Sequence, residues 1–462
     1  MSRTFPHQLA EQGLESSTAD GCVVLVDAST SANLRWANNT LTTNGLMHGS
    51  QVTVISTVDG GQGVASGAVS RSASSLDDVR SLVQAADAAA RSAGPADDAA
   101  DLLGGDADAD FAEDAEPTSI SVFDELAPAL GEAFGRARSA NQLLYGYVEH
   151  TVFTTYVATS SGLRRRHVQP TGHIGITGKS TDLVSSAWVG QSTRDFCDVD
   201  ATALDNELVR RLGWAQRTVA LPAGRYDTIL PPTAVADLLI YAYWTAGARD
   251  ALEGQTVYGR PGGGTRVGEQ LSRHPVQLWS DPEHAGLQCA PFVTAAASSS
   301  QSSVFDNGLP LQRTHWISDG RLTALGQTRR SAGLSDLPVT PFVDNLVMDV
   351  DGAAGSVEDL VAGTKRGLLL TCLWYIREVD PQTLLLTGLT RDGVYLVEDG
   401  EVTGAVNNFR FNESPVDLLD RFSRAGGTVP SFSREWGDYF PRTATPPLQV
   451  PDFNMSSVSQ AQ

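Results

Sequence analysis

The chain has 462 residues, of which 41% are hydrophobic, and this exceeds the roughly 100 to 200 residues usual for one domain, so we expect two large domains. It carries 33 Lys and Arg against 54 Asp and Glu, a formal net charge of -21. Phosphate backbones and anionic lipids repel such a chain, so neither nucleic acid nor a membrane is an expected partner.

No targeting or spanning segment is evident. Residues 1–12 lack an apolar core of signal-peptide length, and later apolar runs are too short or too interrupted to cross a bilayer. We therefore expect a cytoplasmic protein. The cysteines lie far apart without a C-x-x-C pair, which fits neither a disulfide framework nor a Cys-rich zinc site. Buried free thiols are expected at Cys22, Cys197, Cys289 and Cys372.

The first part of the chain predicts a small α/β unit. Residues 22–26 are a β-branched apolar run and residues 52–58 alternate apolar with polar side chains, so both are predicted strands. Asn44-Gly45 and Asp59-Gly60-Gly61 tolerate positive φ and predict hairpin turns.

A helix and an acidic segment come next. Ser75 precedes a one-sided apolar stripe, which predicts a helix that Ser75 caps and Gly94-Pro95 ends. Residues 97–116 then contain nine acids and no Lys or Arg. Such a segment cannot bury enough apolar surface to offset the entropy lost on ordering, so we expect a mobile, solvated insertion. An acidic docking tail is the alternative.

The rest of the N-terminal half predicts further helices and strands. Residues 126–144 are Ala-rich and predict a helix, whereas residues 147–159 and 165–189 predict strands. A helix over residues 201–214 closes an N-terminal α/β domain of residues 1–217.

The second half opens with a strand at residues 224–230 that runs into a proline pair. A helix over residues 233–252 follows, with Pro232 in its first turn and Gly254 at its end. Residues 259–268 are Gly-rich and residues 295–303 are Ser-rich, and both predict long loops.

The last third is the most regular. Ser356 caps a short predicted helix with Lys365-Arg366 in its last turn and Gly367 just beyond it. Asp399-Gly400 lies between two β-type runs and predicts a type I′ hairpin. The expected fold class is α+β, with a C-terminal β-rich domain over residues 218–462 whose core is a barrel or a sandwich.

Several segments resemble, in order and spacing, the TldD/PmbA family of metallopeptidase-related proteins. The resemblance is loose over most of the chain and close over residues 340–422. It rests on Leu34 to Asn39, on Gly224-Arg225-Tyr226-Asp227 with Leu230-Pro231-Pro232, on Asn345-Leu346 and Gly352, on Ser356-x-Glu358-Asp359-Leu360 and Lys365-Arg366-Gly367-Leu368, and on Thr387-Gly388 with Gly393-x-Tyr395 to Glu401.

The resemblance implies cytosolic proteins that work in pairs, with a catalytic TldD-type chain and a PmbA-type chain enclosing a chamber for extended peptides. The catalytic chain holds zinc through His-Glu-x-x-x-His. Here Thr245, Ala246 and Asp250 stand at the three matching positions, and no histidine occurs between His173 and His274. The chain is therefore similar to the PmbA (TldE-like) branch, and we expect it to bind no zinc and no other cofactor itself.

Four histidines and Cys372 are further candidate site residues. His167 and His173 face one side of a predicted strand, about 20 Å apart if it is extended at about 3.3 Å per residue, too far for one ion unless the chain turns at Pro170. His274 and His284 flank an Asp-Pro pair and suit turn or surface roles. Cys372 lies in an apolar run, where an inert thiol is expected. We therefore assign no catalytic, cofactor or metal residue.

Two further motifs are typical of anion-binding sites. Gly178-Lys179-Ser180 is similar to the end of a phosphate loop, but His173 stands where the first glycine is required. Arg164-Arg165-Arg166-His167 is a basic patch that suits a peptide carboxylate, an acidic partner surface or a solvated strand edge.

The expected function is that of the non-catalytic subunit, a pseudo-enzyme, of a TldD/TldE-type peptidase acting on extended peptides. Its partner would be a TldD-type chain that carries the zinc. One alternative is a stand-alone divergent hydrolase. The other is a non-enzymatic peptide-binding protein.

Overall fold

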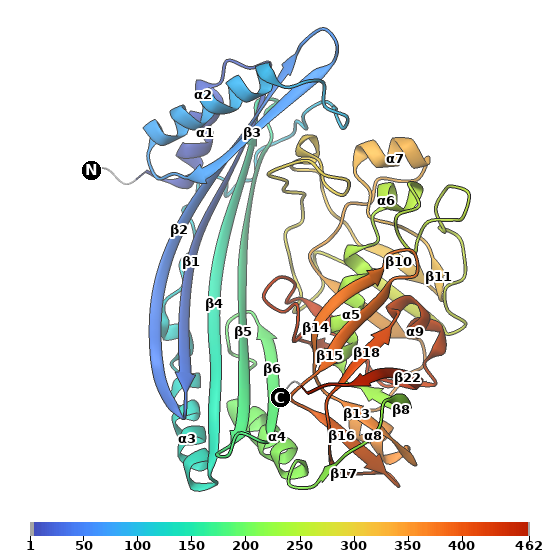
Figure 1. Ribbon diagram of the computed structural model, residues 1–462. Helices are drawn as coiled ribbons and strands as arrows, with labels where there is room; N and C mark the ends of the chain where they lie inside the picture. Colours follow the sequence, from blue (N-terminus) through green and yellow to red (C-terminus); the bar gives the residue numbers. More distant parts are fainter. Residues whose placement is uncertain (1–3, 461–462) are drawn as a thin grey trace.

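A computed structural model describes residues 4–460 as an α+β fold with three β-sheets, none of which closes into a barrel within those residues. Figure 1 shows the long strands of the N-terminal half on one side and the C-terminal half facing them. No helix in residues 4–460 is long and apolar enough to span a bilayer.

The N-terminal half is one antiparallel sheet in the order β3-β2-β1-β4-β5-β6. Its strands are β1 (Gly21–Ala37), β2 (Thr40–Asp59), β3 (Val64–Ser72), β4 (Gln142–Thr159), β5 (Arg164–Ser180) and β6 (Ser186–Thr193). Its helices are α1 (Pro6–Ser16), α2 (Leu76–Ser92), the short 3₁₀ turn η1 (Ile120–Phe123), α3 (Leu126–Ser139) and α4 (Ala201–Trp214).

The C-terminal half contains the other two sheets. One has the order β11-β10-β9-β12-β21-β20, and the other has the order β14-β15-β18-β22-β8-β13-β16-β17-β7, with β19 paired to β22. The strands are β7 (Thr218–Val219), β8 (Gly224–Leu230), β9 (Val276–Ser280), β10 (Thr314–Ser318), β11 (Arg321–Leu322), β12 (Leu346–Val350), β13 (Arg366–Leu370), β14 (Leu373–Asp380), β15 (Leu385–Thr390), β16 (Val394–Glu398), β17 (Glu401–Val406), β18 (Phe409–Glu413), β19 (Arg424–Ala425), β20 (Val429–Ser431), β21 (Thr443–Thr445) and β22 (Leu448–Val458). The helices are α5 (Pro232–Trp244), α6 (Ala248–Leu252), the 3₁₀ turn η2 (Val304–Asp306), α7 (Arg329–Ser335), α8 (Val357–Ala362) and α9 (Pro415–Arg421).

Helix α5 is the centre of the C-terminal core. Apart from Asp237, its buried side chains from Ala234 to Ile240 are apolar and lie on all sides of the helix, as expected for a helix enclosed by other elements. Its side chains join one hydrophobic cluster with strands of both sheets, including Leu278 of β9 and Leu370 of β13. The core therefore consists of two open sheets with a helix between them, and not of a closed barrel.

Turn positions were predicted with mixed success. Asp399 and Gly400 have φ values of 48° and 85°, which confirms the type I′ hairpin between β16 and β17. The turn predicted at Asn44-Gly45 is wrong, because these residues pair with β1 inside β2. The hairpin instead turns at Asn38 and Asn39, whose φ values are 51° and 59°. Asn-Asn, like Asn-Gly, can adopt the positive φ values of a tight hairpin turn, so the local sequence did not decide between Asn38-Asn39 and Asn44-Gly45.

Three predicted helix boundaries also differ. The helix predicted over residues 126–144 ends at Ser139, because β4 begins at Gln142. The helix predicted over residues 233–252 is two helices, with a break at Gly247, whose backbone is extended. The helix after Ser356 ends at Ala362, so Lys365 and Arg366 lie beyond it and Arg366 begins β13.

The acidic segment, residues 97–116, has little regular structure, but it is not the solvated insertion that its composition predicts. Phe111 is buried and packs edge-on against Tyr156 at 5.8 Å. Backbone groups at Ala107 and Asp108 pair with Arg164 along the edge of β5 that β6 leaves uncovered. The acids of this segment lie next to the arginines of β5, and the ion pairs between them hold the segment on the sheet. The composition of the segment alone does not reveal these pairs.

The basic patch on β5 is therefore neutralised within the chain. Arg164 forms a two-point ion pair with Glu11 at 2.6 and 2.8 Å. Arg165 pairs with Asp108 at 3.0 Å, and the buried Arg166 pairs with Asp110 at 2.9 Å. These arginines are consequently neither a solvated strand edge nor a free carboxylate site.

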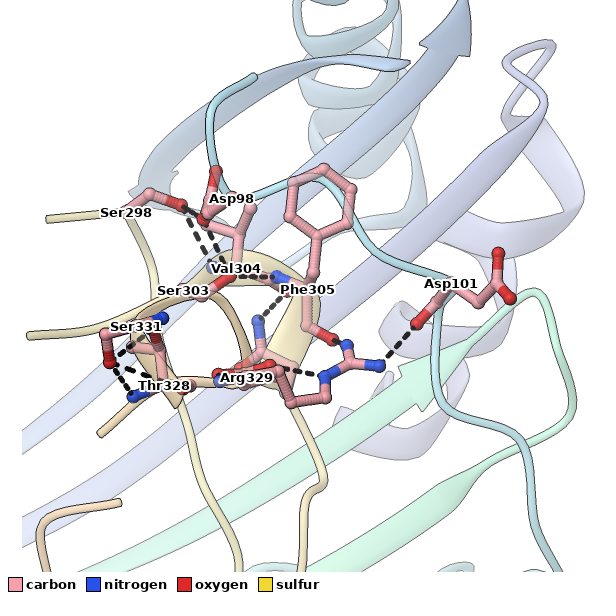
Figure 2. Close-up of polar contacts among 11 residues, drawn as sticks. Asp98, Asp101, Ser298, Ser303, Val304, Phe305, Thr328, Arg329 and Ser331 are labelled. Atoms are coloured by element: carbon pink, nitrogen blue, oxygen red, sulfur yellow. Dashed lines mark hydrogen bonds and ion pairs between the residues drawn. The ribbon is translucent and has the colours of Figure 1, made fainter. Parts of the chain in front are cut away.

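The start of the acidic segment also ties the two halves together (Figure 2). Asp98 accepts hydrogen bonds from the hydroxyls of Ser298 and Ser303 at 2.5 and 2.6 Å. Arg329 donates to the carbonyl of Asp101 at 3.0 Å and pairs with the buried Asp306 at 2.6 Å. Residues 97–101 thus act as a polar strap from the N-terminal sheet to the loops before and around η2 and α7.

We predict that Gly400→Val destabilises the protein by about 1 to 3 kcal/mol, because the hairpin requires positive φ there. A Cβ atom at Gly400 would also lie 2.8 Å from the carbonyl oxygen of Ala362. Gly352→Val is the matched control, because Gly352 has φ of 79° but open space around it. Urea denaturation should show the larger loss for Gly400→Val. An unchanged midpoint for that variant would contradict the assigned turn.

We also predict that Phe111→Ala lowers the free energy of unfolding by about 3 kcal/mol, because it empties a packed aromatic site. Phe153→Ala, at a side chain that is 46% exposed, should change it by less than about 0.5 kcal/mol. Chemical denaturation of both variants checks this. Equal small effects would restore the interpretation of residues 97–116 as a solvated insertion.

Candidate functional site

The two faces of the N-terminal sheet are chemically different. Side chains of a strand alternate between faces, and β1, β4 and β5 carry this alternation across the molecule. Even-numbered residues such as Val24, Val148 and Ile174 pack against the helices. Odd-numbered residues face the C-terminal half. Where β1 begins they are apolar, and Val23 packs with Phe305 of η2. Farther along, they become polar.

A cleft lies between this polar face and the segment after β20. It consists of two cavities of about 650 and 610 Å³ that share His173, Gly437 and Asp438. The sheet side of the larger cavity presents hydroxyl, amide, carboxylate and imidazole groups, among them Ser31, Glu149, Thr151, Thr155, Gln169 and Thr171. The smaller cavity is more aromatic, with Tyr147, Trp188, Trp374 and Phe432 in its walls.

Hydrogen bonds hold the polar side chains of the larger cavity in place. The Ser31 hydroxyl donates to Glu149 Oε1 at 2.8 Å and accepts from the Thr151 hydroxyl at 3.0 Å. The Thr155 hydroxyl donates to Asp27 at 2.6 Å, and burial raises the pKa of the Asp27 carboxyl. The surface is thus ordered before any ligand binds, which lowers the entropy cost of binding.

His173 stands where the two cavities meet. Its Nε2 lies 3.7 Å from Asp438 Oδ1, and its ring stacks on Phe432 with centroids 5.4 Å apart. Burial lowers the pKa of this imidazole, and the negative charges of Asp438 and Glu149 oppose the shift. A largely neutral imidazole suits hydrogen bonding to a ligand, but no nucleophile of the described residues accompanies it.

Direct hydrogen bonds join the two halves at the edge of the cleft. Arg442 Nη1 donates to the Thr171 hydroxyl at 3.0 Å. Gln169 Nε2 donates to the carbonyl of Gln288 at 3.2 Å, and Arg194 donates to the Gln288 side chain at 2.8 Å. With the strap at residues 97–101, these contacts fix the width of the cleft.

A buried carboxylate anchors the cleft segment from behind. Asp237 of α5 is fully buried and accepts hydrogen bonds from the Ser433 hydroxyl and, at 2.9 Å, from the backbone N–H of Glu435. Its carbonyl accepts from Trp436 Nε1 at 2.9 Å. Burial raises the pKa of Asp237 to about 7, against the opposing effect of the bonds from Ser433 and Glu435. Its Oδ2 atom lacks a partner within residues 4–460.

The residues that the family resemblance assigns to the zinc-motif positions do not fit a metal. Thr245 donates its hydroxyl to carbonyls in the last turn of α5, at 3.1 and 3.2 Å. Ala246 has no donor atom and is buried. Asp250 of α6 accepts from Ser300 at 3.2 Å and from Gln301 at 3.3 Å. The set offers one carboxylate, which is too few ligands for zinc.

The other candidate residues also have structural contacts. His167 and His173 do line one face, as predicted, but β5 runs straight through Pro170 and His167 bonds to Gln169 at 3.1 Å. His274 stacks on Phe422 at 4.0 Å, and His284 lies edge-on to Trp279 at 5.0 Å. Within residues 4–460, no group of three or more His, Cys, Asp or Glu side chains is placed to hold a metal ion.

The thiols are unsuited to nucleophilic chemistry. Cys22, Cys289 and Cys372 are buried and free, whereas Cys197 is exposed, contrary to prediction, because it follows β6 in a surface turn. Burial raises the pKa of Cys22 and Cys289 to about 12 and that of Cys372 further. A thiolate is the reactive form of cysteine, so these residues are chemically inert at neutral pH.

Sequence analysis missed the aromatic part of the cleft. Trp188, Trp374, Phe432 and Arg434 come from two halves of the chain and meet only in the fold. The one signal available was the aromatic and charged composition of residues 432–440 in a stretch without helical or strand periodicity.

Together, these features define a two-part α+β protein with a preformed polar cleft between its halves. The family model for the PmbA/TldA metallopeptidase C-terminal domain matches residues 223–457, more than half of the chain. The chain therefore belongs to the TldD/PmbA family of metallopeptidase-related proteins. A sequence search of curated proteins found no match.

Solved structures share the fold over nearly the whole length. TldE from Thermococcus kodakarensis is similar with a TM-score of 0.76 at 17% identity, over 96% of this chain and 98% of that chain. A candidate modulator of a DNA gyrase from Thermotoga maritima gives 0.72 at 15% identity, over 94% and 95%. Another from Bacteroides thetaiotaomicron gives 0.76 at 14% identity, over 98% of each chain.

We predict a pH dependence of stability that Asp237 carries. Its pKa is about 7 in the folded state and near the ordinary value of 3.8 in the unfolded state. The folded state therefore binds the proton more tightly than the unfolded state. The resulting contribution to stability is full below the unfolded-state pKa, falls as pH rises and is lost above the folded-state pKa.

Asp237→Asn should remove this contribution, because an amide mimics the protonated acid. When the pH is raised from about 5 to about 8, the urea denaturation midpoint should fall less in the variant than in the unmodified chain. An equal fall in both would assign the proton to another acid.

Proposed function

We propose that this protein is a non-catalytic, PmbA/TldE-like subunit that acts with a TldD-type catalytic chain in the proteolysis of extended peptides in the cytoplasm. The observation that carries the proposal is a preformed polar cleft in a member of a metallopeptidase family. At the positions that match the family's zinc motif, this chain has Thr245, Ala246 and Asp250. The cleft supports peptide binding, and the substituted positions argue that the metal is held by another chain.

The shape and chemistry of the cleft favour an extended peptide. Its floor is formed by β4 and β5, so side chains that face it repeat along each strand at alternate residues, which is also the spacing of side chains in an extended peptide. The hydroxyl protons of Ser31 and Thr151 are engaged within the chain, so their oxygens offer acceptors to the N–H groups of a peptide backbone.

The divergent hydrolase is the weaker candidate. Hydrolysis needs a metal-activated water or an activated nucleophile. The thiol pKa values are raised, and His173 has an acidic neighbour but no hydroxyl or thiol partner to activate among the described contacts. A peptide-binding protein without a peptidase partner would use the same cleft, so only the presence of a partner distinguishes that candidate.

The proposal predicts that the purified chain contains far less than one zinc per molecule and does not cleave extended peptides. Mixed with a TldD-type chain from the same organism, it should form a stable complex and raise or redirect cleavage by that chain. Metal analysis, gel filtration of the mixture and mass spectrometry of peptide products are the measurements.

The control is the same mixture with the His-Glu-x-x-x-His motif of the TldD-type chain replaced, which should abolish cleavage without abolishing the complex. Stoichiometric zinc with chelator-sensitive cleavage by the lone chain would overturn the proposal in favour of the hydrolase. Absence of any complex with the TldD-type chain would favour the stand-alone peptide-binding protein.

A further inference from the structure

We propose that Arg434, together with Arg35, forms a binding site for a peptide carboxylate in the aromatic part of the cleft. This inference rests on the proposal that the cleft receives extended peptides, and it deepens that proposal by naming a chemical feature of the peptide that is recognised. It replaces the sequence-based hypothesis of a carboxylate site at Arg164 to Arg166, whose charges are neutralised inside the chain.

The Arg434 guanidinium lies over the rings of two tryptophans. Its Cζ atom lies 4.5 Å from the ring centroid of Trp374 on β14 and 5.0 Å from that of Trp188 on β6. Stacking on aromatic faces leaves the in-plane N–H groups of a guanidinium available for a ligand. Arg434 also lines the smaller cavity, so its charge faces the cleft.

The stack continues to the centre of the cleft. Trp188 stacks on Phe432 at 6.2 Å, and Phe432 stacks on His173 at 5.4 Å. Gly190 makes this arrangement possible, because a Cβ atom there would lie 2.3 Å from the Trp188 ring. The orientation of the Arg434 side chain is therefore set by a series of ring contacts that begins at His173 on β5. Because this side chain is already ordered, little conformational entropy is lost when it binds a ligand.

Of the two acids that line this cavity, Glu435 is occupied elsewhere, whereas the Asp438 side chain is largely exposed. Glu435 accepts from the backbone N–H groups of Tyr375 and Ile376 at 2.9 and 3.1 Å and from Arg377 at 3.3 Å. Asp438 lies beside His173. Within residues 4–460, neither Arg434 nor Arg35 forms an ion pair with a carboxylate.

This lack of an acidic partner distinguishes Arg434 and Arg35 from the arginines of the basic patch. With 33 Lys and Arg against 54 Asp and Glu, arginines in this protein readily find acids, as Arg164 to Arg166 do. Arg434 Nε is in addition buried without a hydrogen-bond partner. Two unpaired guanidiniums in one cavity of about 610 Å³ therefore favour a carboxylate, which pairs with arginine through two parallel hydrogen bonds.

The carboxylate has two sources in a peptide, the C-terminus and an acidic side chain. The probes that separate them are N-acetyl-Ala-Ala-Ala-Phe with a free C-terminus, the same peptide as its C-terminal amide, and N-acetyl-Ala-Asp-Ala-Phe amide. Binding of each to the isolated full chain is measured by calorimetry at low ionic strength. The free acid or the Asp peptide should bind more tightly than the neutral amide by about 10-fold to 100-fold, as expected for a hydrogen-bonded charge pair.

Variants assign the effect to this site. Arg434→Gln should abolish the preference for the carboxylate, and Arg434→Lys should retain only part of it, because a lysine cannot pair through a planar fork. Arg35→Gln should weaken the preference and serves as the second variant if Arg434→Gln does not fold. Arg313→Gln is the matched control, because the Arg313 guanidinium also lies over an indole, that of Trp279 at 4.0 Å, but outside this cavity.

Equal binding of all three peptides, no measurable binding of any of them, or an unchanged preference in Arg434→Gln and Arg35→Gln would overturn the inference. If only the free-acid peptide binds tightly, the site recognises a peptide C-terminus. If the Asp peptide binds as tightly as the free-acid peptide, the site also accepts an acidic side chain. The test needs neither a TldD-type chain nor cleavage. Its failure is therefore distinguishable from failure of the proposed subunit role, which the complex-formation experiment decides.

Discussion

The period of two along unusually long strands is the constraint on which the rest of the structure depends. Because β1, β4 and β5 extend across the molecule, every second side chain must be covered on one face and meets the C-terminal half on the other. Helices α1 to α4 cover the apolar face. The opposite face is apolar only where it touches η2, near Val23, and is polar beyond that point. A single alternation therefore produces both the core and the cleft.

The distribution of arginine explains how so acidic a chain holds two halves together. Arg164 pairs with Glu11 of α1, and Arg165 pairs with Asp108 of the acidic segment. Arg329 binds Asp306 and the strap at residues 97–101. Such pairs reduce the repulsion among acids where the halves approach each other. Arg434 forms no such pair within the described residues, and it is the arginine for which we propose a role in ligand binding.

Stability and the cleft are coupled through α5. The same buried helix that fills the space between the two C-terminal sheets carries Asp237, which holds the cleft segment by its side chain and its carbonyl. A carboxyl with one oxygen unsatisfied is costly to bury. Its cost is offset by the order that it gives to Ser433, Glu435 and Trp436, and through them to the wall of the cleft.

The sequence by itself determined the elements whose signals are local. The cap at Ser75, the helix over residues 201–214 and the Asp399-Gly400 hairpin depend on neighbours within a few residues, so they were predictable. The assignment of Thr245, Ala246 and Asp250 to the zinc-motif positions also rests on local sequence, and it stays a prediction. Only the tertiary structure decided the turn at Asn38-Asn39, the packing of residues 97–116 on β5, and the aromatic stack around Arg434. Each of these depends on strand register or on contacts between residues far apart in the chain, and composition and periodicity contain no information about such contacts.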